Sequence, residues 1–104
     1  LKTGNWLKEQ LEVLKKDFPL IGDVRGEGYF LGVELILDPE SREPAPLQAD
    51  YVVERMKSRK ILLSTEGPGN NVLKFKPPMV FNFNNAQHLL SGLEHVLGES
   101  PLLQ

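Results

Sequence analysis

Three stretches of helical hydrophobic periodicity alternate with two stretches rich in glycine and β-branched residues, and this alternation limits the folds open to the chain. Apolar residues recur at helical spacing from Leu7 to Phe18, which predicts a helix over residues 2–17 that ends before Pro19. A second helix is predicted over 46–58, with Pro46 in its first turn.

The third predicted helix covers residues 83–97. Asn82 precedes it as a candidate N-cap, and Gly98 follows it as a candidate stop. The buried stripes of the second and third helices are predicted to contain Ala49, Val52, Val53, Met56, Ala86, Leu89, Leu90, Leu93, Val96 and Leu97. Each apolar stripe must pack against another apolar surface of the protein to be shielded from water.

Strands are predicted between the helices. Residues 29–31 and 33–37 form one strand with Gly32 inside it, residues 61–63 a short one, and residues 72–76 another that ends at Pro77. Helices separated by strand pairs predict an α+β fold, with a small, mostly antiparallel sheet covered by helices on one face. We expect a single domain over 1–104, with a flexible tail over 98–104.

Composition excludes several classes of protein. With 104 residues, 12 basic and 14 acidic side chains and a net charge of −2, the chain lacks the basic excess that nucleic acids and anionic membranes select. It contains no cysteine, so disulfides and thiolate metal sites are ruled out. It begins with Leu1 rather than methionine, from which we expect a fragment of a longer protein.

Histidine and glycine patterns provide no metal or dinucleotide site. His88 and His95 lie seven residues apart on the third predicted helix, about 10.5 Å along its axis, too far apart to share one zinc ion. The run GEGYFLG over 26–32 has the wrong glycine spacing for a dinucleotide fingerprint, and a strand rather than a helix follows it. We therefore predict surface histidines and no metal.

The loop over 67–71 is the most suggestive polar segment. Its glycines and asparagines, followed by Lys74 and Lys76, could present backbone amides and two ammonium groups to an anion. The same residues are also typical of a tight turn followed by two solvated lysines, and the residues alone favour this second interpretation. No catalytic residue is predicted in the chain.

Two runs and the closing helix resemble the carboxy-terminal domain of class-III aminotransferases, which are pyridoxal-phosphate enzymes of fold type I. The runs are IGDVRGEGYFLGVEL and ILLSTEGPGNNVLKFKPPM. The second run is most similar to phospho-lyases that act on phosphoethanolamine and phosphohydroxylysine. The position of Lys74 is arginine in most class-III aminotransferases, and a lysine there is compatible with a phosphate rather than a carboxylate.

The resemblance implies that this chain is the small domain of a larger enzyme. Pyridoxal 5'-phosphate would be the cofactor of the complete enzyme, but none of the lysines here matches the motif of the Schiff-base lysine. The expected role is to close one side of an active site, with Lys74 and, less strongly, Lys76 contacting a small phosphorylated amine substrate. We expect no activity from the 104 residues alone.

Partner contacts are predicted at apolar residues outside the buried stripes, namely Trp6, Val13, Leu47 and Tyr51. The expected partners are the large cofactor-binding domain of the same polypeptide and a second copy in a homo-oligomer. Two alternatives to a phospho-lyase stay open: an ordinary amino-group transfer by the complete enzyme, and a free-standing α+β interaction module without catalysis. The expected compartment is the cytoplasm, or the mitochondrial matrix in a eukaryote.

Overall fold

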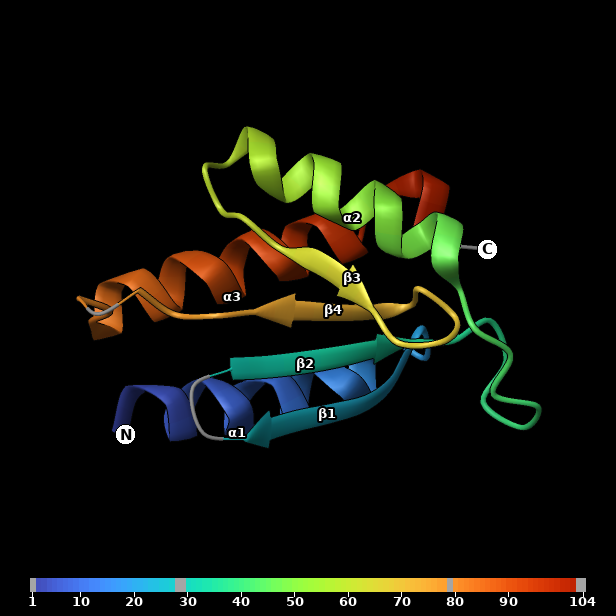
Figure 1. The fold of residues 1–104 in the computed structure, drawn as a ribbon, viewed down its shortest axis with the longest axis horizontal. Helices are drawn as coiled ribbons and strands as arrows, with labels where there is room; N and C mark the ends of the chain where they lie inside the picture. The colour runs from blue at the N-terminus through green and yellow to red at the C-terminus, as the bar shows by residue number, and fades with distance from the viewer. Residues whose placement is uncertain (1, 28–29, 79, 103–104) are drawn as a thin grey trace.

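The computed structural model describes residues 2–27, 30–78 and 80–102, and in that part of the chain three helices accompany one four-stranded sheet (Figure 1). The elements are α1 (Lys2–Asp17), β1 (Ile21–Glu27), β2 (Phe30–Leu35), α2 (Pro46–Ser58), β3 (Ser64–Glu66), β4 (Val72–Phe75), α3 (Phe83–Leu97) and the short 3₁₀ turn η1 (Ser100–Leu102). The strand order is β1-β2-β4-β3, and every neighbouring pair is antiparallel. The predicted α+β class is confirmed.

All three helices have the predicted bounds. Their ends follow from local chemistry, most clearly at α3. There the Asn82 side chain accepts the Asn85 amide at 2.9 Å, while the Asn85 side chain accepts the Asn82 amide at 3.0 Å. This reciprocal pair satisfies two amides that a helix start leaves without partners. Gly98 ends the helix, as predicted.

The strands differ from the prediction in four places, and the smallest difference is that β4 ends at Phe75 rather than at residue 76. β1 has no counterpart among the predicted strands. β2 ends at Leu35 rather than at residue 37, because the chain beyond it turns to pair with the following loop: Ile36 forms an isolated bridge with Pro44, and the Leu37 amide donates to the Glu43 carbonyl. Tyr29, predicted in this strand, lies outside the described residues.

The predicted strand over 61–63 is wrong, and β3 begins three residues later. Lys60 takes a positive φ of 64°, and the Ile61 amide donates back to Met56, so the chain is still leaving α2 at this point. The Ile61 side chain is buried close to Gly92 of α3. Ile61 therefore docks the chain on the helices, whereas Leu62 is 75% exposed, and ladder pairing with β4 begins only at Ser64.

The sheet has one covered and one open face. Figure 1 shows α1 and α3 behind the sheet and α2 along its upper edge, and no described segment crosses in front. Val24, Val33 and Leu73 are paired across the strands and are buried on the covered face. Because side chains alternate along a strand, the next residues point the other way. The open face contains Asp23, Arg25, Phe30, Gly32, Glu34, Ser64, Glu66, Val72 and Lys74.

The core lies between the covered face and the helices. Leu11 of α1 is only 1% exposed, and it lines a void of about 20 Å³ together with Leu73 of β4, Met56 of α2 and Leu93 of α3. Every residue around this void is apolar. Leu11 thus lies where the sheet side and the helical side of the same core meet.

A buried asparagine joins the end of β2 to the loop before β4. The Asn71 side chain donates to the Leu35 carbonyl at 2.8 Å, and the Asn71 carbonyl accepts the Leu35 amide at 2.8 Å. Asn71 is 4% exposed and is the one buried polar residue found among the described side chains. It extends the β2–β4 pairing past the last regular residue.

Part of the segment predicted as a flexible tail packs against the domain. Leu102 is buried, and the Glu99 carboxylate accepts hydrogen bonds from Tyr51 and Arg55 of α2. Glu99 and Leu102 are therefore held against the rest of the domain. Residues 103 and 104, also predicted in the tail, lie outside the described part of the chain. Among the described helices, none has the length and apolar character needed to cross a membrane.

Candidate functional site

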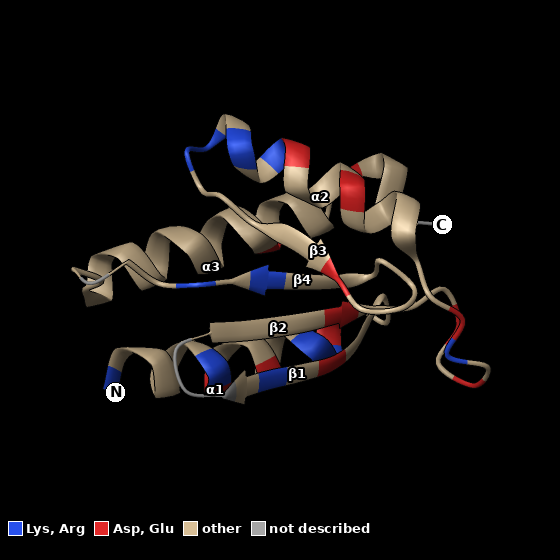
Figure 2. Ribbon diagram, viewed as in Figure 1, with Lys and Arg blue, Asp and Glu red and all other residues tan. Residues whose placement is uncertain are grey.

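Lys74 lies in the middle of the open sheet face. Its direct neighbours on the adjoining strands are Gly32 and Ser64, which have no side chain or a small one. The Lys74 ammonium lies 2.9 Å from a Glu66 carboxylate oxygen and 4.5 Å from the centre of the Phe30 ring. Figure 2 shows the basic residue on β4 beside the acidic residue on β3.

A shallow hollow of about 410 Å³ surrounds this pair. Its lining includes both predicted lysines, Lys74 and Lys76, together with Glu66 and Ser64. Lys76 is exposed, and no carboxylate oxygen lies within 4.0 Å of its ammonium among the described side chains. The hollow therefore carries two ammonium groups and one carboxylate, so an anion is the ligand that it favours.

Elsewhere on the open face the charges pair with one another. Glu34 accepts Arg42 at 2.7 Å and also faces Arg25 at 3.6 Å, while Arg25 contacts Asp23 at 3.0 Å. The charges of two carboxylates and two guanidinium groups cancel in that part of the face. Among the described side chains of this face, the excess of positive charge thus lies at the Lys74 end.

The loop over 67–71 is a turn rather than an anion cradle. Gly67 and Asn70 both take positive φ, and the Asn70 amide donates to the Gly67 carbonyl at 3.1 Å. The Asn71 side chain is bonded to Leu35, as described above. Since these polar groups already have partners inside the protein, the loop contributes to the site mainly by joining β3 to β4.

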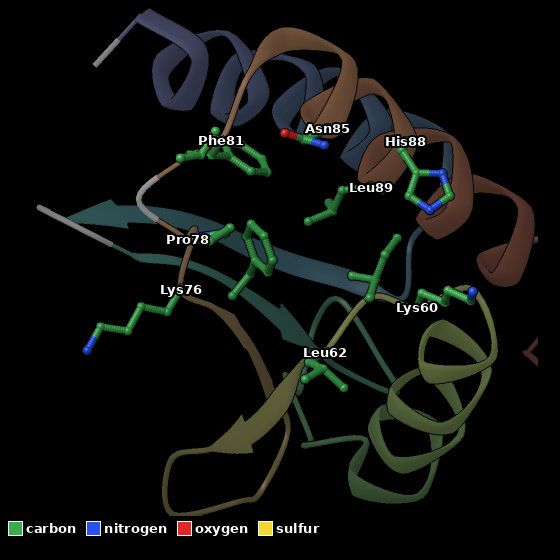
Figure 3. A pocket seen from close by; sticks show the side chains of 11 residues that line it. Lys60, Leu62, Lys76, Pro78, Phe81, Asn85, His88 and Leu89 are labelled. Carbon is green, nitrogen blue, oxygen red and sulfur yellow. The ribbon is translucent and has the colours of Figure 1, made fainter.

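A second, more apolar groove of about 380 Å³ lies between α3 and the segment that follows β4 (Figure 3). Phe81 and Leu89 face into it, whereas the Lys76 ammonium points away from it. Lys60 and His88 lie at its other end. This groove holds no acid–base pair, so we assign it no chemistry.

The predicted contact residues fall into two pairs. The Trp6 ring packs 4.5 Å from the Phe83 ring, and the Tyr51 hydroxyl donates to Glu99 at 2.6 Å, so both have partners within the chain. Val13 is 53% and Leu47 77% exposed. A contact of these residues with another domain or subunit stays a prediction.

Both histidines lie at the surface, as predicted. His88 lies 3.0 Å from the Arg59 carbonyl, and His95 lies 3.7 Å from a Glu99 oxygen. Across residues 2–27, 30–78 and 80–102 no group of three or more histidine and acidic side chains could hold a metal ion.

The Glu99 carboxylate forms a cluster with Arg55 and Tyr51 in which the pKa of each group is shifted. Hydrogen bonds from Arg55 and then from Tyr51 lower the pKa of Glu99 from 4.5 to about 2. The bond to Glu99 raises the pKa of Tyr51 and that of Arg55 in turn. The shifts therefore report an anchor for the last turn of the chain.

Acid should weaken this anchor. Because the folded state lowers the pKa of Glu99, its stabilising effect is complete above about pH 4.5 and is lost as the pH falls toward 2. We expect Glu99→Gln to melt below the unmodified protein at pH 7, with a difference that narrows between pH 5 and 2. Thermal unfolding across this range tests it, with the exposed Glu94→Gln as control. A difference that stayed constant with pH would refute the assignment.

Comparison with known proteins places the chain in a family. A model of the family "Aminotransferase class-III" matches residues 1–97. The chain belongs to the class-III aminotransferase family. This family depends on pyridoxal phosphate, and its members include phospho-lyases and transaminases similar to this chain.

Two class-III relatives are similar over most of the chain. "Alanine--glyoxylate aminotransferase 2-like" from Drosophila melanogaster is 46% identical over 98 residues, covering 93% of this chain and 20% of the relative. "Ethanolamine-phosphate phospho-lyase homolog 1" from Caenorhabditis elegans is 41% identical over 97 residues, covering 92% and 21%. The chain thus spans about a fifth of the length of the curated relatives it matches.

Solved class-III structures share the fold. A phospholyase from Arthrobacter in complex with phosphoethanolamine superposes with a TM-score of 0.89 at 38% identity, over 96% of this chain and 24% of that one. A Bacillus anthracis aminotransferase gives a TM-score of 0.83 at 29% identity, over 92% and 22%. The chain therefore corresponds to the small part of a larger class-III enzyme.

The described residues do not by themselves fit pyridoxal phosphate. The cofactor needs a lysine for its Schiff base and a carboxylate beside its pyridine nitrogen, both shielded from water. Every described lysine is exposed or half-exposed, and no buried carboxylate is found among the described side chains. The hollow lined by Lys74 and Lys76 is instead the candidate site of this class-III chain for binding a ligand.

Glu66, Ser64 and Phe30 are the site residues that the sequence did not predict. Ser64 and Glu66 lie between the predicted strand over 61–63 and the loop over 67–71, and Phe30 lies in a predicted strand without an assigned partner. The run Ser64–Glu66 was too short to show alternation, but pairing it with β4 would have put Glu66 diagonal to Lys74.

Proposed function

We propose that the chain is the carboxy-terminal small domain of a pyridoxal-phosphate-dependent phospho-lyase, and that it presents Lys74 to the phosphate of a phosphorylated amine. The observation that carries this proposal is the hollow on the open sheet face, where Lys74 and Lys76 provide two ammonium groups against the single carboxylate of Glu66. The relatives named as phospho-lyases, one of them bound to phosphoethanolamine, support the same substrate class.

Under this proposal the chain binds the substrate phosphate, and the large domain with its cofactor carries the chemistry. Lys74 offers three N–H donors on a point charge, which suits phosphate oxygens approaching from the solvent side of the sheet. The bound cofactor supplies the electron sink for elimination, and its lysine lies in the large domain of the same polypeptide under this proposal. The 104 residues then bind and orient the leaving phosphate, and they are inactive alone.

Lys74→Ala in the complete enzyme tests the proposal. We expect KM for a phosphorylated amine to rise about tenfold, since a hydrogen bond to a charged group contributes roughly 1.5–3 kcal/mol. Lys76→Ala should have a smaller effect, because that ammonium is more exposed. The assay follows released inorganic phosphate, and Lys57→Ala on the outer surface of α2 serves as control. Unchanged kcat and KM in Lys74→Ala would remove Lys74 from the site.

Amino-group transfer is the second candidate, because the Drosophila relative carries an aminotransferase name at 46% identity. The two reactions differ in their products. A phospho-lyase releases inorganic phosphate from the amine without a keto acid, whereas a transaminase needs a keto acid and converts it to an amino acid. Measuring both products from one reaction mixture separates the two functions.

A further inference from the structure

Glu66 already holds Lys74, the group that the proposed function assigns to the substrate phosphate. The two side chains are diagonal neighbours on the β3–β4 pair, since Ser64 pairs with Lys74 and Glu66 with Val72. Diagonal neighbours in an antiparallel pair are within reach of long side chains. The separation of 2.9 Å between ammonium and carboxylate is that of a hydrogen-bonded ion pair.

The other groups around the Lys74 ammonium allow it to exchange the Glu66 carboxylate for another anion. Lys74 retains 32% and Glu66 46% side-chain exposure, so both reach solvent. The Phe30 ring holds the cation from a second side at 4.5 Å, which fixes its position without using an N–H donor. Gly32 and Ser64, directly across from Lys74, leave room for an incoming group.

We propose that Glu66 is a specificity-determining residue that competes with the substrate phosphate for Lys74. When the phosphate arrives, it takes the place of the Glu66 carboxylate on the ammonium, and when inorganic phosphate leaves, the carboxylate returns. Both anions need the same donors, and they repel each other at this range. Glu66 therefore weakens phosphate binding and shortens the stay of the product. This inference rests on the proposed function of Lys74.

Glu66→Gln in the complete, cofactor-loaded enzyme provides the test. The amide keeps an oxygen that can accept from Lys74, so the lysine stays in place while the competing charge is removed. We expect the Kd of inorganic phosphate, measured by isothermal titration calorimetry, to fall about two- to fivefold, the range that exposed ion pairs span. KM for the phosphorylated amine should fall in parallel, and kcat should not rise, because the product phosphate stays bound longer.

Two controls separate this effect from others. Glu54→Gln removes the same charge from another exposed glutamate–lysine pair, where Glu54 lies 3.4 Å from Lys57, and it should leave the Kd of phosphate unchanged. Glu66→Gln added to Lys74→Ala should have a much smaller effect than Glu66→Gln alone, since most of its action passes through Lys74. Thermal unfolding of each variant checks that the fold persists.

The outcomes distinguish this inference from the proposed function. If Lys74→Ala weakens phosphate binding but Glu66→Gln leaves it unchanged or weaker, the competition is refuted and the role of Lys74 stands. An effect of Glu66→Gln that keeps its full size in the Lys74→Ala background also refutes it. If Lys74→Ala itself leaves phosphate binding unchanged, the proposed function of Lys74 fails and this inference fails with it.

Discussion

Replacing Leu11 with alanine is expected to lower the free energy of unfolding by about 2–5 kcal/mol, the range for a fully buried leucine. Leu11 is 1% exposed and borders a void shared with the sheet and with two other helices. The substitution enlarges a space that is apolar on all sides, so water cannot fill it usefully. A loss of this size is a large fraction of the total stability of a domain, about 5–15 kcal/mol.

Denaturant unfolding of the chain measures the loss at Leu11. Val13→Ala provides the matched control, because Val13 lies on the same helix and is 53% exposed. That substitution should change the free energy of unfolding by less than about 0.5 kcal/mol, as is usual at the surface. Equal losses at the two positions would contradict the packing of α1 described above.

Replacing Asn71 with aspartate is expected to cost about 3 kcal/mol or more at pH 7, because the change puts a carboxylate beside the Leu35 carbonyl in a buried position. The aspartate oxygen cannot donate unless it is protonated. Burial beside a carbonyl raises the pKa of the new carboxyl group, so the cost should shrink as the pH falls and the proton returns. Stability curves at pH 7 and at pH 4 measure this difference.

Two further variants make the test at position 71 specific. Asn71→Ala removes the hydrogen bond without adding charge, and the Leu35 carbonyl keeps the Ala45 amide at 3.1 Å, so the loss should be smaller and independent of pH. Asn5→Asp makes the same chemical change at an exposed position in the first turn of α1, where a negative charge is tolerated. An Asn71→Asp protein as stable as Asn5→Asp would overturn the role of Asn71.

The helices could be predicted from the sequence because their determinants are local. The leucine spacing of α1, Pro46 at the start of α2 and the Asn82 cap of α3 each lie within a few residues of what they fix. β1 could not be located, because its seven residues include two glycines and alternating charge instead of a regular apolar pattern. The short β3 was misplaced because Ile61, which precedes it, packs against α3 instead of pairing with β4.

The candidate site was predicted only as far as Lys74 and Lys76. Pairing of Lys74 with Glu66 depends on the register of β3 and β4, which the misplaced strand hid. The contact with Phe30 depends on pairing of β2 with β4, and the whole of α2 lies between those strands. Since no local pattern encodes a pairing across that distance, the surroundings of Lys74 required the fold.

Because one face of the sheet is open, the residues needed for folding and the residues available for ligand binding lie on opposite faces. Residues that hold the domain together and residues that meet a ligand alternate along the same strands, so Leu73 and Lys74 are adjacent in sequence yet face opposite sides. Mutations on the open face can therefore accumulate with little cost to folding, while the covered face stays under selection for packing. Such a sheet allows a lineage to change the ligand it recognises one residue at a time, on a scaffold whose interior need not evolve.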